Sequence, residues 1–149
     1  ANVTISGIAA DAEVRLQKAR SIGLETVVVD NTGPLATQLD NEVDILIEAS
    51  GSPSALEAAH ETVKPGGLIG VVATYPTTVA LPATDLVRRE QHLHTSFGST
   101  LADYERAMEH LTDGDIPVKQ LVETFPLNDA VSAFEASITK ATPKAVVLP

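Results

Sequence analysis

The 149-residue chain is 44% hydrophobic, a content that is typical of a folded domain with its own core and argues against a disordered chain. Its formal net charge of −10 repels phosphate backbones, and its 3% aromatic content offers few stacking surfaces, so we expect no nucleic-acid partner. It has no cysteine, so we expect neither disulfides nor thiolate metal sites, which fits a cytoplasmic location. It has no apolar run of about 18 residues, so we expect no membrane partner.

The first third of the chain alternates strand and helix patterns. Residues 3–6 alternate as a strand does, and the helix pattern that follows has Asp11 as its predicted N-cap and Gly23 as its left-handed end. Residues 25–30 and 43–50 are apolar runs typical of strands covered on both faces. Between them, residues 31–39 predict a turn and a short, weak helix or loop.

The middle of the chain continues this alternation. A helix follows Ser52, its predicted N-cap, and Pro53 occupies the preferred first helical position. The sequence KPGG at residues 64–67 predicts a turn, and residues 68–74 a third buried strand. Residues 75–82 are irregular, with a short strand possible at 78–81. A helix at residues 84–90 and a strand at 91–97 complete this part.

The last third predicts helix, strand, helix and strand, at residues 100–112, 121–125, 126–139 and 144–149. In the third of these elements we expect Leu127, Val131 and Phe134 to face inward. Strands alternating with helices over the whole chain predict an α/β fold, a mostly parallel sheet with helices on both faces.

Small residues stand where the predicted strands end. In open parallel sheets, ligands bind beyond the carboxyl ends of the strands, and small side chains let a ligand approach the backbone closely. A competing explanation is that small residues simply make tight turns between strand and helix. The strand-end residues considered on this basis include Gly7, Ala49, Ser50, Gly51, Ala73, Thr74, Phe97 and Gly98.

Three stretches resemble the C-terminal half of medium-chain, zinc-type alcohol dehydrogenases, in particular sorbitol and threonine dehydrogenase-like members. They are ASGSPSALEAAHETVKPGGLIGVVATY from residue 49, DLVRREQHLHTSFGST from residue 85 and FPLNDAVSAFEASITKATPKAVVLP from residue 125. The resemblance extends over residues 1–149. It implies a partial, Rossmann-like dinucleotide-binding domain at residues 1–125, and a C-terminal helix and strand at residues 126–149 that would return to a catalytic domain.

No GxGxxG motif occurs in the sequence, although this glycine-rich loop grips the pyrophosphate in such domains. The first residues resemble the family's second strand, so the resemblance implies that the first strand–helix unit with its loop is missing. We therefore expect either a fragment of a longer enzyme or a reused half of the fold.

The resemblance implies an NAD(P)-dependent oxidoreductase that transfers hydride at a secondary alcohol or polyol. Its zinc would be held by an upstream domain, so we assign no catalytic residue and no metal ligand here, and expect the chain alone to be inactive. A homo-oligomer is expected, and residues 78–81 could pair across a two-fold axis. The alternative is a non-catalytic α/β module used for association.

Cofactor contacts follow from the same resemblance. Gly7 stands where family members that use NAD carry a ribose-binding carboxylate, which favours NADP over NAD. Arg15 could meet the 2′-phosphate or face solvent, and an N-cap role for Asp11 is favoured over a ribose contact. The remaining implied contacts are Ala49, Ser50 and Gly51 beside the adenine and its ribose, Val72, Ala73 and Thr74 near the nicotinamide, and Phe97 and Gly98 completing that pocket.

Two further features are open. His92 and His94 share one face of a predicted strand, but no third ligand has a recognisable spacing, so a structural or surface role is favoured over metal binding. Glu48 ends a predicted buried strand, where its carboxylate could hold a neighbouring loop or a residue of an absent catalytic domain.

Overall fold

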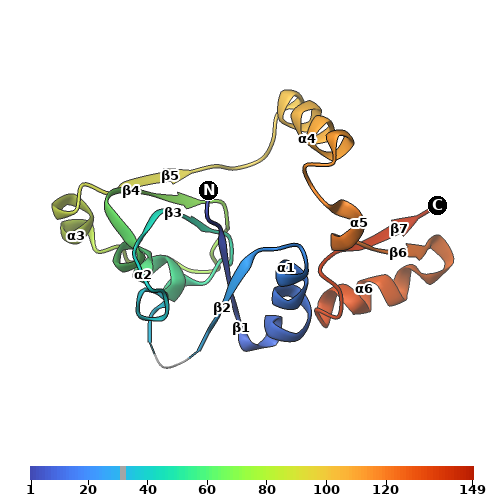
Figure 1. The fold of residues 1–149 in the computed structure, drawn as a ribbon, viewed down its shortest axis with the longest axis horizontal. Coiled ribbons are helices and arrows are strands. Elements are labelled where there is room, and N and C mark those ends of the chain that lie inside the picture. Colours follow the sequence, from blue (N-terminus) through green and yellow to red (C-terminus); the bar gives the residue numbers. More distant parts are fainter. Residues whose placement is uncertain (31–32) are drawn as a thin grey trace. The chain divides into compact units, whose positions relative to one another are not determined.

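The computed structural model describes residues 1–30 and 33–149 (Figure 1). The chain forms two compact units, one comprising Ala1–Asp30 and Ser99–Pro149 and the other residues 31–98. The start of the turn predicted at residues 31–39 lies outside the described residues. Within the described part, no helix is long and apolar enough to cross a membrane.

The first unit begins with a parallel strand pair, β1 (Thr4–Ile8) and β2 (Glu25–Val29). A continuous helical segment connects them, with a 3-10 turn at Ala9–Asp11, a wider π turn at Ala12–Leu16 and α1 at Gln17–Ser21. Gly23 ends the segment at a φ of 88°, the left-handed conformation predicted for it. Leu16 and Ala19 are the buried side chains of this segment, 2% and 8% exposed.

The prediction that Asp11 is the N-cap is wrong. The helical segment begins at Ala9, directly after the extended residue Ile8, so Asp11 occupies the third helical position. Its carboxylate accepts a hydrogen bond from the preceding Ile8 N–H (3.3 Å) instead of from the N–H groups that follow. The acid still stabilises the start of the helix, but from inside the first turn.

The second part of this unit begins with α4 (Leu101–Asp113). Thr100 and Asp103 form a capping box, in which the Thr100 hydroxyl accepts from the Asp103 N–H (3.3 Å) and the Asp103 carboxylate accepts from the Thr100 N–H (2.8 Å). Gly114 ends α4 at a φ of 81°. The short helix α5 (Val118–Leu121) follows, which the sequence did not predict.

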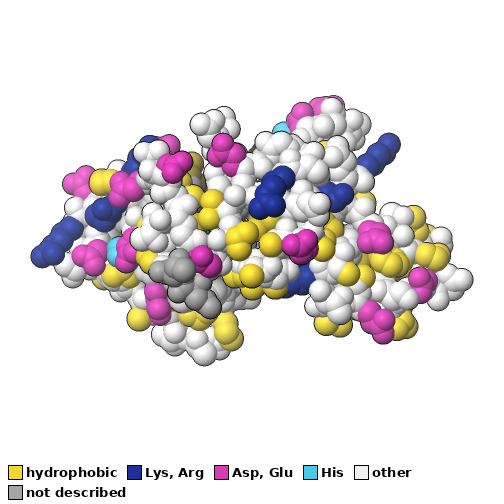
Figure 2. Space-filling model, turned by 60° about the horizontal axis from the view of Figure 1, so that its bottom comes forward, with side chains coloured by type: hydrophobic (Ala, Val, Ile, Leu, Met, Phe, Trp, Pro, Cys, Tyr) yellow, Lys and Arg dark blue, Asp and Glu magenta, His cyan; other side chains and the backbone are white. Residues whose placement is uncertain are grey.

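The chain closes with a second parallel pair, β6 (Glu123–Pro126) and β7 (Ala145–Leu148). A 3-10 turn at Leu127–Asp129 and α6 (Ala130–Ile138) connect them. Ala133 is the buried residue of α6, and the expected inward face is wrong. Figure 2 shows apolar side chains exposed in the part that holds α6, and 64–79% of the surface is exposed for Leu127, Val131, Phe134 and Ile138.

The second unit holds a three-stranded parallel sheet in the order β3 (Val43–Glu48), β4 (Val63–Val71) and β5 (His92–Thr95). Its other elements are a 3-10 turn at Leu35–Gln38, α2 (Pro53–Thr62) and α3 (Ala83–Arg88). Its core is formed by Leu56, Ala59, Val63, Ile69 and Val71.

Burial of β3 on both faces was predicted, and the structure shows burial on one. Ile45 and Ile47, which alternate with the inward-facing residues of β3, are 58% and 59% exposed. A continuous apolar run gives no information about which element covers the second face of a strand. Glu48, on the covered face, is 4% exposed.

The KPGG turn lies within β4 instead of before it. Val43 pairs with Val63 and Ile45 pairs with Leu68, so residues 64–67 leave the ladder between these two pairs, with Gly66 at a φ of 73°. At its other end β4 stops at Val71, three residues before the predicted end. Residues 78–81 do not form the predicted strand.

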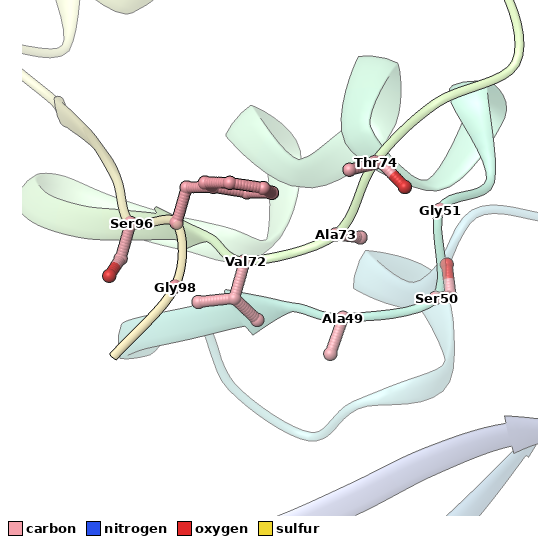
Figure 3. Close-up of a pocket in the computed structure, with 9 residues that line it drawn as sticks. Ala49, Ser50, Gly51, Val72, Ala73, Thr74, Ser96 and Gly98 are labelled. Carbon is pink, nitrogen blue, oxygen red and sulfur yellow. The ribbon is translucent and has the colours of Figure 1, made fainter. Parts of the chain in front are cut away.

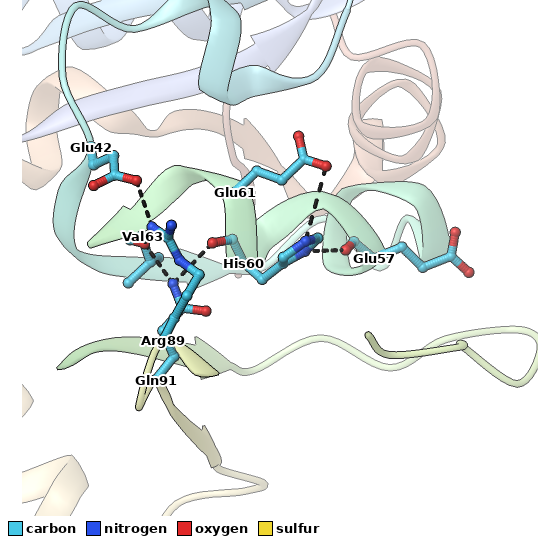
Figure 4. Close-up of polar contacts among 7 residues, drawn as sticks. All are labelled: Glu42, Glu57, His60, Glu61, Val63, Arg89 and Gln91. Carbon is cyan, nitrogen blue, oxygen red and sulfur yellow. Dashed lines mark hydrogen bonds and ion pairs between the residues drawn. The ribbon is translucent and has the colours of Figure 1, made fainter. Parts of the chain in front are cut away.

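Two side chains that precede β5 donate hydrogen bonds to backbone carbonyls at the C-terminal end of α2 (Figure 4). The Gln91 amide donates to the carbonyl oxygens of His60 (2.9 Å) and Val63 (2.5 Å), and the Arg89 guanidinium donates to the Val63 carbonyl (2.8 Å) and to Glu42. These donors satisfy carbonyls that a helix end leaves without partners. This polar cluster therefore has a structural role.

Candidate functional site

The register of the sheet brings three strand ends to one edge. Glu48 pairs with Val71, and Val71 pairs with Thr95. The ladder continues for one more step, because the Val72 N–H donates to the Glu48 carbonyl (3.0 Å) and the Ser96 N–H donates to the Val71 carbonyl (3.1 Å). The segments at residues 49–51, 72–74 and 96–98 therefore leave the sheet side by side.

These three segments surround a cavity of about 560 Å³ (Figure 3). Every cofactor residue that the sequence predicted in this unit lies in its lining, and Ser96 joins them. Ser96 follows β5 directly, so the strand-end rule applied to Thr95 would have found it. The lining consists of Ala49, Ser50, Gly51, Val72, Ala73, Thr74, Ser96, Phe97 and Gly98.

Gly51 and Thr74 bring two of the segments close together. A Cβ atom at residue 51 would lie 2.7 Å from the Thr74 carbonyl oxygen, and the φ of Gly51 is 72°. Both the space and the backbone conformation therefore require glycine at this position. The small residue predicted here therefore allows two backbone segments to lie close together.

The cavity combines backbone groups with uncovered apolar surface. Phe97 is 94% exposed and Val72 is 51% exposed, although both are apolar. Apolar walls with a small number of fixed polar groups are typical of sites for flat organic ligands and cofactors. The lining has no ionisable side chain.

Glu48 lies behind the lining and is the buried acid of this edge. Its carboxylate accepts hydrogen bonds from the Ser50 N–H (2.9 Å), the Gly51 N–H (3.4 Å) and the hydroxyls of Ser50 and Tyr75. Burial favours a higher pKa for Glu48, but the hydrogen bonds from Ser50, Tyr75 and Gly51 outweigh burial and hold its pKa below the ordinary value. Burial, together with this carboxylate, raises the pKa of the Tyr75 phenol. Of the two roles considered from the sequence, the structure shows the holding of a neighbouring segment.

Gly7 and Arg15 belong to the other unit and are not part of this lining. A Cβ atom at Gly7 would lie 3.1 Å from Leu16 Cδ2 and 3.2 Å from Asp11 Cβ, so the glycine lets the helical segment pack closely on β1. Arg15 pairs with Asp11 (3.4 Å). Lys140 pairs with the same carboxylate (3.0 Å), a contact that no local sequence pattern indicates.

No group of three or more metal-ligating side chains occurs among the described residues. His92 and His94 both lie on β5 and are exposed. The structure places no third ligand beside them in the described ranges.

Comparison with known proteins identifies the family. Residues 1–113 match the sequence profile of the zinc-binding dehydrogenase family. The chain belongs to this family. A glucose 1-dehydrogenase of Thermoproteus tenax is 30% identical over 65% of the chain and 31% of its own length. A sorbitol dehydrogenase of Bombyx mori is 28% identical over 89% of the chain and 40% of its own length. The chain thus spans less than half of each of these dehydrogenases.

Solved structures of zinc-binding dehydrogenases and related enzymes have the same fold. The 2R,3R-butanediol dehydrogenase of Bacillus subtilis matches 98% of this chain and 43% of its own with a TM-score of 0.83 and 21% identity. A short chain alcohol dehydrogenase of E. coli complexed with NADH matches 98% of this chain and 43% of its own (TM-score 0.82, 19% identity). A putative zinc-binding dehydrogenase of Sinorhizobium meliloti bound to NADP matches 99% of this chain and 45% of its own (TM-score 0.78, 20% identity). The predicted Rossmann-like α/β fold is confirmed.

Proposed function

We propose that the cavity at the carboxyl edge of β3, β4 and β5 binds a nicotinamide cofactor, and that the chain is the cofactor-binding part of an NAD(P)-dependent alcohol or polyol dehydrogenase. The observation that carries this proposal is the cavity itself, lined by the residues predicted for that cofactor. Membership of the zinc-binding dehydrogenase family supports the same reaction class.

The lining suits a flat, polar-edged cofactor. In our proposal, residues 49–51 contact the adenine and its ribose, and residues 72–74 with Phe97 and Gly98 contact the nicotinamide ring. Backbone groups fix the face of such a ring, because they have no side-chain rotamers to reorganise. When bound, the cofactor supplies or accepts the hydride, and the residues of this chain hold it in place.

NADP is the favoured cofactor. Gly7 leaves the end of β1 without a carboxylate at that position, and the nearby Asp11 carboxylate is engaged by Lys140 and Arg15. The side chains of Lys140 and Arg15 are 36% and 41% exposed, so both cations remain accessible to a 2′-phosphate. Lys140→Met should therefore weaken NADPH binding by about tenfold, or about 1.4 kcal/mol of binding free energy. NADH binding should stay unchanged.

The catalytic groups belong to the part of the relatives that this chain does not span. We propose that a zinc ion held there polarises the substrate oxygen, that the substrate is a small secondary alcohol or polyol, and that this chain alone is inactive. The division into residues 1–125 and 126–149 and the cytoplasmic location stay predictions.

Association is the second candidate function, alone or together with the first as a homo-oligomer. An exposed apolar stripe favours it, because Leu127 of the 3-10 turn and Val131, Phe134 and Ile138 of α6 follow one another at helical spacing. Light scattering at several concentrations tests it. A mass that rises with concentration, and a Phe134→Glu variant that stays monomeric, would support it, whereas a constant monomer mass would contradict it.

NADPH fluorescence titration tests the first proposal. Saturable binding is expected, and Ala73→Phe should abolish it because a ring at residue 73 fills the cavity. Lys119→Phe, on the other unit, is the matched control and should bind as the unaltered chain does. Equal binding by all three proteins would contradict the proposed site.

A further inference from the structure

A buried carboxylate connects two of the segments that line the cavity. Glu48 is the last residue of β3 and is 4% exposed, and it is not part of the lining. The covered face of the sheet around it is apolar, with Ile69 and Val71 on the neighbouring strand. A charged group in this place costs free energy unless every lone pair finds a donor, so its hydrogen bonds indicate what it does there.

Both oxygens of Glu48 have donors. Oε1 accepts from the Ser50 N–H (2.9 Å) and the Ser50 hydroxyl, and Oε2 accepts from the Gly51 N–H (3.4 Å) and the Tyr75 hydroxyl. Ser50 and Gly51 belong to the segment that follows β3, whereas Tyr75 follows the segment that leaves β4. One side chain therefore bridges the two segments.

The bridge is anchored at its far end. Tyr75 is half-buried and packs against the core cluster that includes Leu56 and Val71, so the ring that carries its hydroxyl is in contact with the core. Residue 74 lies against Gly51, where a Cβ atom would be 2.7 Å from the Thr74 carbonyl. The spacing of the two segments is thus set by a polar contact on one side and by backbone contact on the other.

A carboxylate suits this place because it accepts in all directions and donates in none. A glutamine of the same shape would turn an NH₂ group toward two of the four donors and leave them without an acceptor. Alanine would leave all four without one. The geometry around Glu48 therefore depends on its charge and on its shape together.

We propose that Glu48 is a positioning residue of the cofactor cavity, which acts through Ser50, Gly51 and Tyr75 to hold residues 49–51 and 72–75 at the spacing that the ligand requires. The role in ligand binding rests on the proposed function above. The bridging of the two segments does not, so the two can be tested separately.

The experiment compares Glu48→Gln and Tyr75→Phe with two controls. Asp44→Asn alters an exposed carboxylate of the same strand, and Ile69→Val removes one buried methyl group from the same core without changing a hydrogen bond. Amide NMR shifts of Ser50 and Gly51, hydrogen exchange at residues 72–75 and NADPH affinity are measured for each protein at neutral pH.

Glu48→Gln should shift the Ser50 and Gly51 amide protons upfield, because charge-assisted hydrogen bonds to them are lost. Both Glu48→Gln and Tyr75→Phe should speed exchange at residues 72–75 and weaken NADPH binding by about tenfold, which neither control does. If Glu48→Gln does not fold, Tyr75→Phe gives the answer alone, since it removes one hydroxyl.

Two results separate the hypotheses. If the unaltered chain does not bind NADPH, the proposed function is contradicted. Faster exchange in Tyr75→Phe would then still support the bridging of the two segments by Glu48. Exchange and affinity that are unchanged in Tyr75→Phe, or changed as much in Ile69→Val, would overturn the positioning role.

Discussion

Lys140 Nζ lies 3.0 Å from Asp11 Oδ1, although 129 residues separate the two in the sequence. The Asp11 carboxylate also accepts from the Ile8 N–H and from Arg15, so it connects the end of β1, the helical segment after it and the loop after α6. Lys140 has a φ of 58°, a conformation that few residues other than glycine adopt. The ion pair therefore joins the two ends of the chain within one unit.

Removing the cation of this pair should destabilise the protein. The Asp11 side chain is 14% exposed, so water replaces Lys140 poorly, and Lys140→Met should lower the free energy of unfolding by about 1 kcal/mol. Lys64→Met breaks the pair with Asp44, whose side chain is 83% exposed, and should have almost no effect. Urea unfolding of both variants measures the difference, and equal losses would show that the Asp11 pair has no special role.

The same pair should make stability depend on acid. Burial favours a higher pKa for Asp11, but the Lys140 and Ile8 hydrogen bonds and the charges of Lys140 and Arg15 lower it below the ordinary value. A lowered pKa in the folded state contributes stability above the unfolded pKa of about 3.9, and the contribution is lost as pH falls through the folded pKa. The stability difference between the unaltered chain and Lys140→Met should therefore be full at pH 6 and shrink below about pH 4. A difference that stays constant down to pH 2 would contradict this.

Gly51→Ala should be more harmful than alanine at a matched glycine. Gly51 and Gly66 have φ values of 72° and 73°, but a Cβ would meet the Thr74 carbonyl at 2.7 Å in the first case and nothing within 4 Å in the second. Gly66→Ala should cost about 1 kcal/mol, from the left-handed conformation alone. Gly51→Ala should cost at least twice as much and weaken NADPH binding. Equal midpoints of thermal unfolding would show that residues 51 and 74 do not approach as closely as the structure indicates.

The capping box of α4 gives a local prediction. Thr100→Ala removes the oxygen that accepts from the Asp103 N–H, and should cost about 1 kcal/mol. Thr112→Ala removes a hydroxyl that donates to the Met108 carbonyl near the other end of the same helix, and should cost much less. Urea unfolding followed by circular dichroism compares them, and an equal or larger loss for Thr112→Ala would count against the cap.

Features that depend on neighbours in the sequence were predicted well. Gly23 ends the helical segment after β1 in the left-handed conformation, as predicted, because few other residues adopt it at low cost. Most residues of the cavity followed from the strand ends, since parallel strands in register must bring their carboxyl ends to one edge. Val72 came from the family resemblance alone, and Ser96 was not predicted.

Features that depend on distant partners were not predicted. The pairing of Asp11 with Lys140 comes from the far end of the chain, so no local sequence pattern indicates it. The apolar patterns predict that Ile45 and Phe134 face inward, but both are exposed, because burial depends on which element covers a residue. Residues 78–81 combine strand-forming residue types with no ladder partner among the described strands, and propensity alone does not form a strand.

An amide NMR titration with NADPH and NADH tests the central claim, that the cavity at the edge of β3, β4 and β5 is the cofactor site. The amide signals of Gly51, Ala73 and Gly98 should shift together and saturate with NADPH, while signals of the Lys64–Gly66 turn, away from the cavity, stay in place. Signals of the cavity residues that remain unchanged at millimolar NADPH and NADH, or shifts confined to other segments, would contradict it.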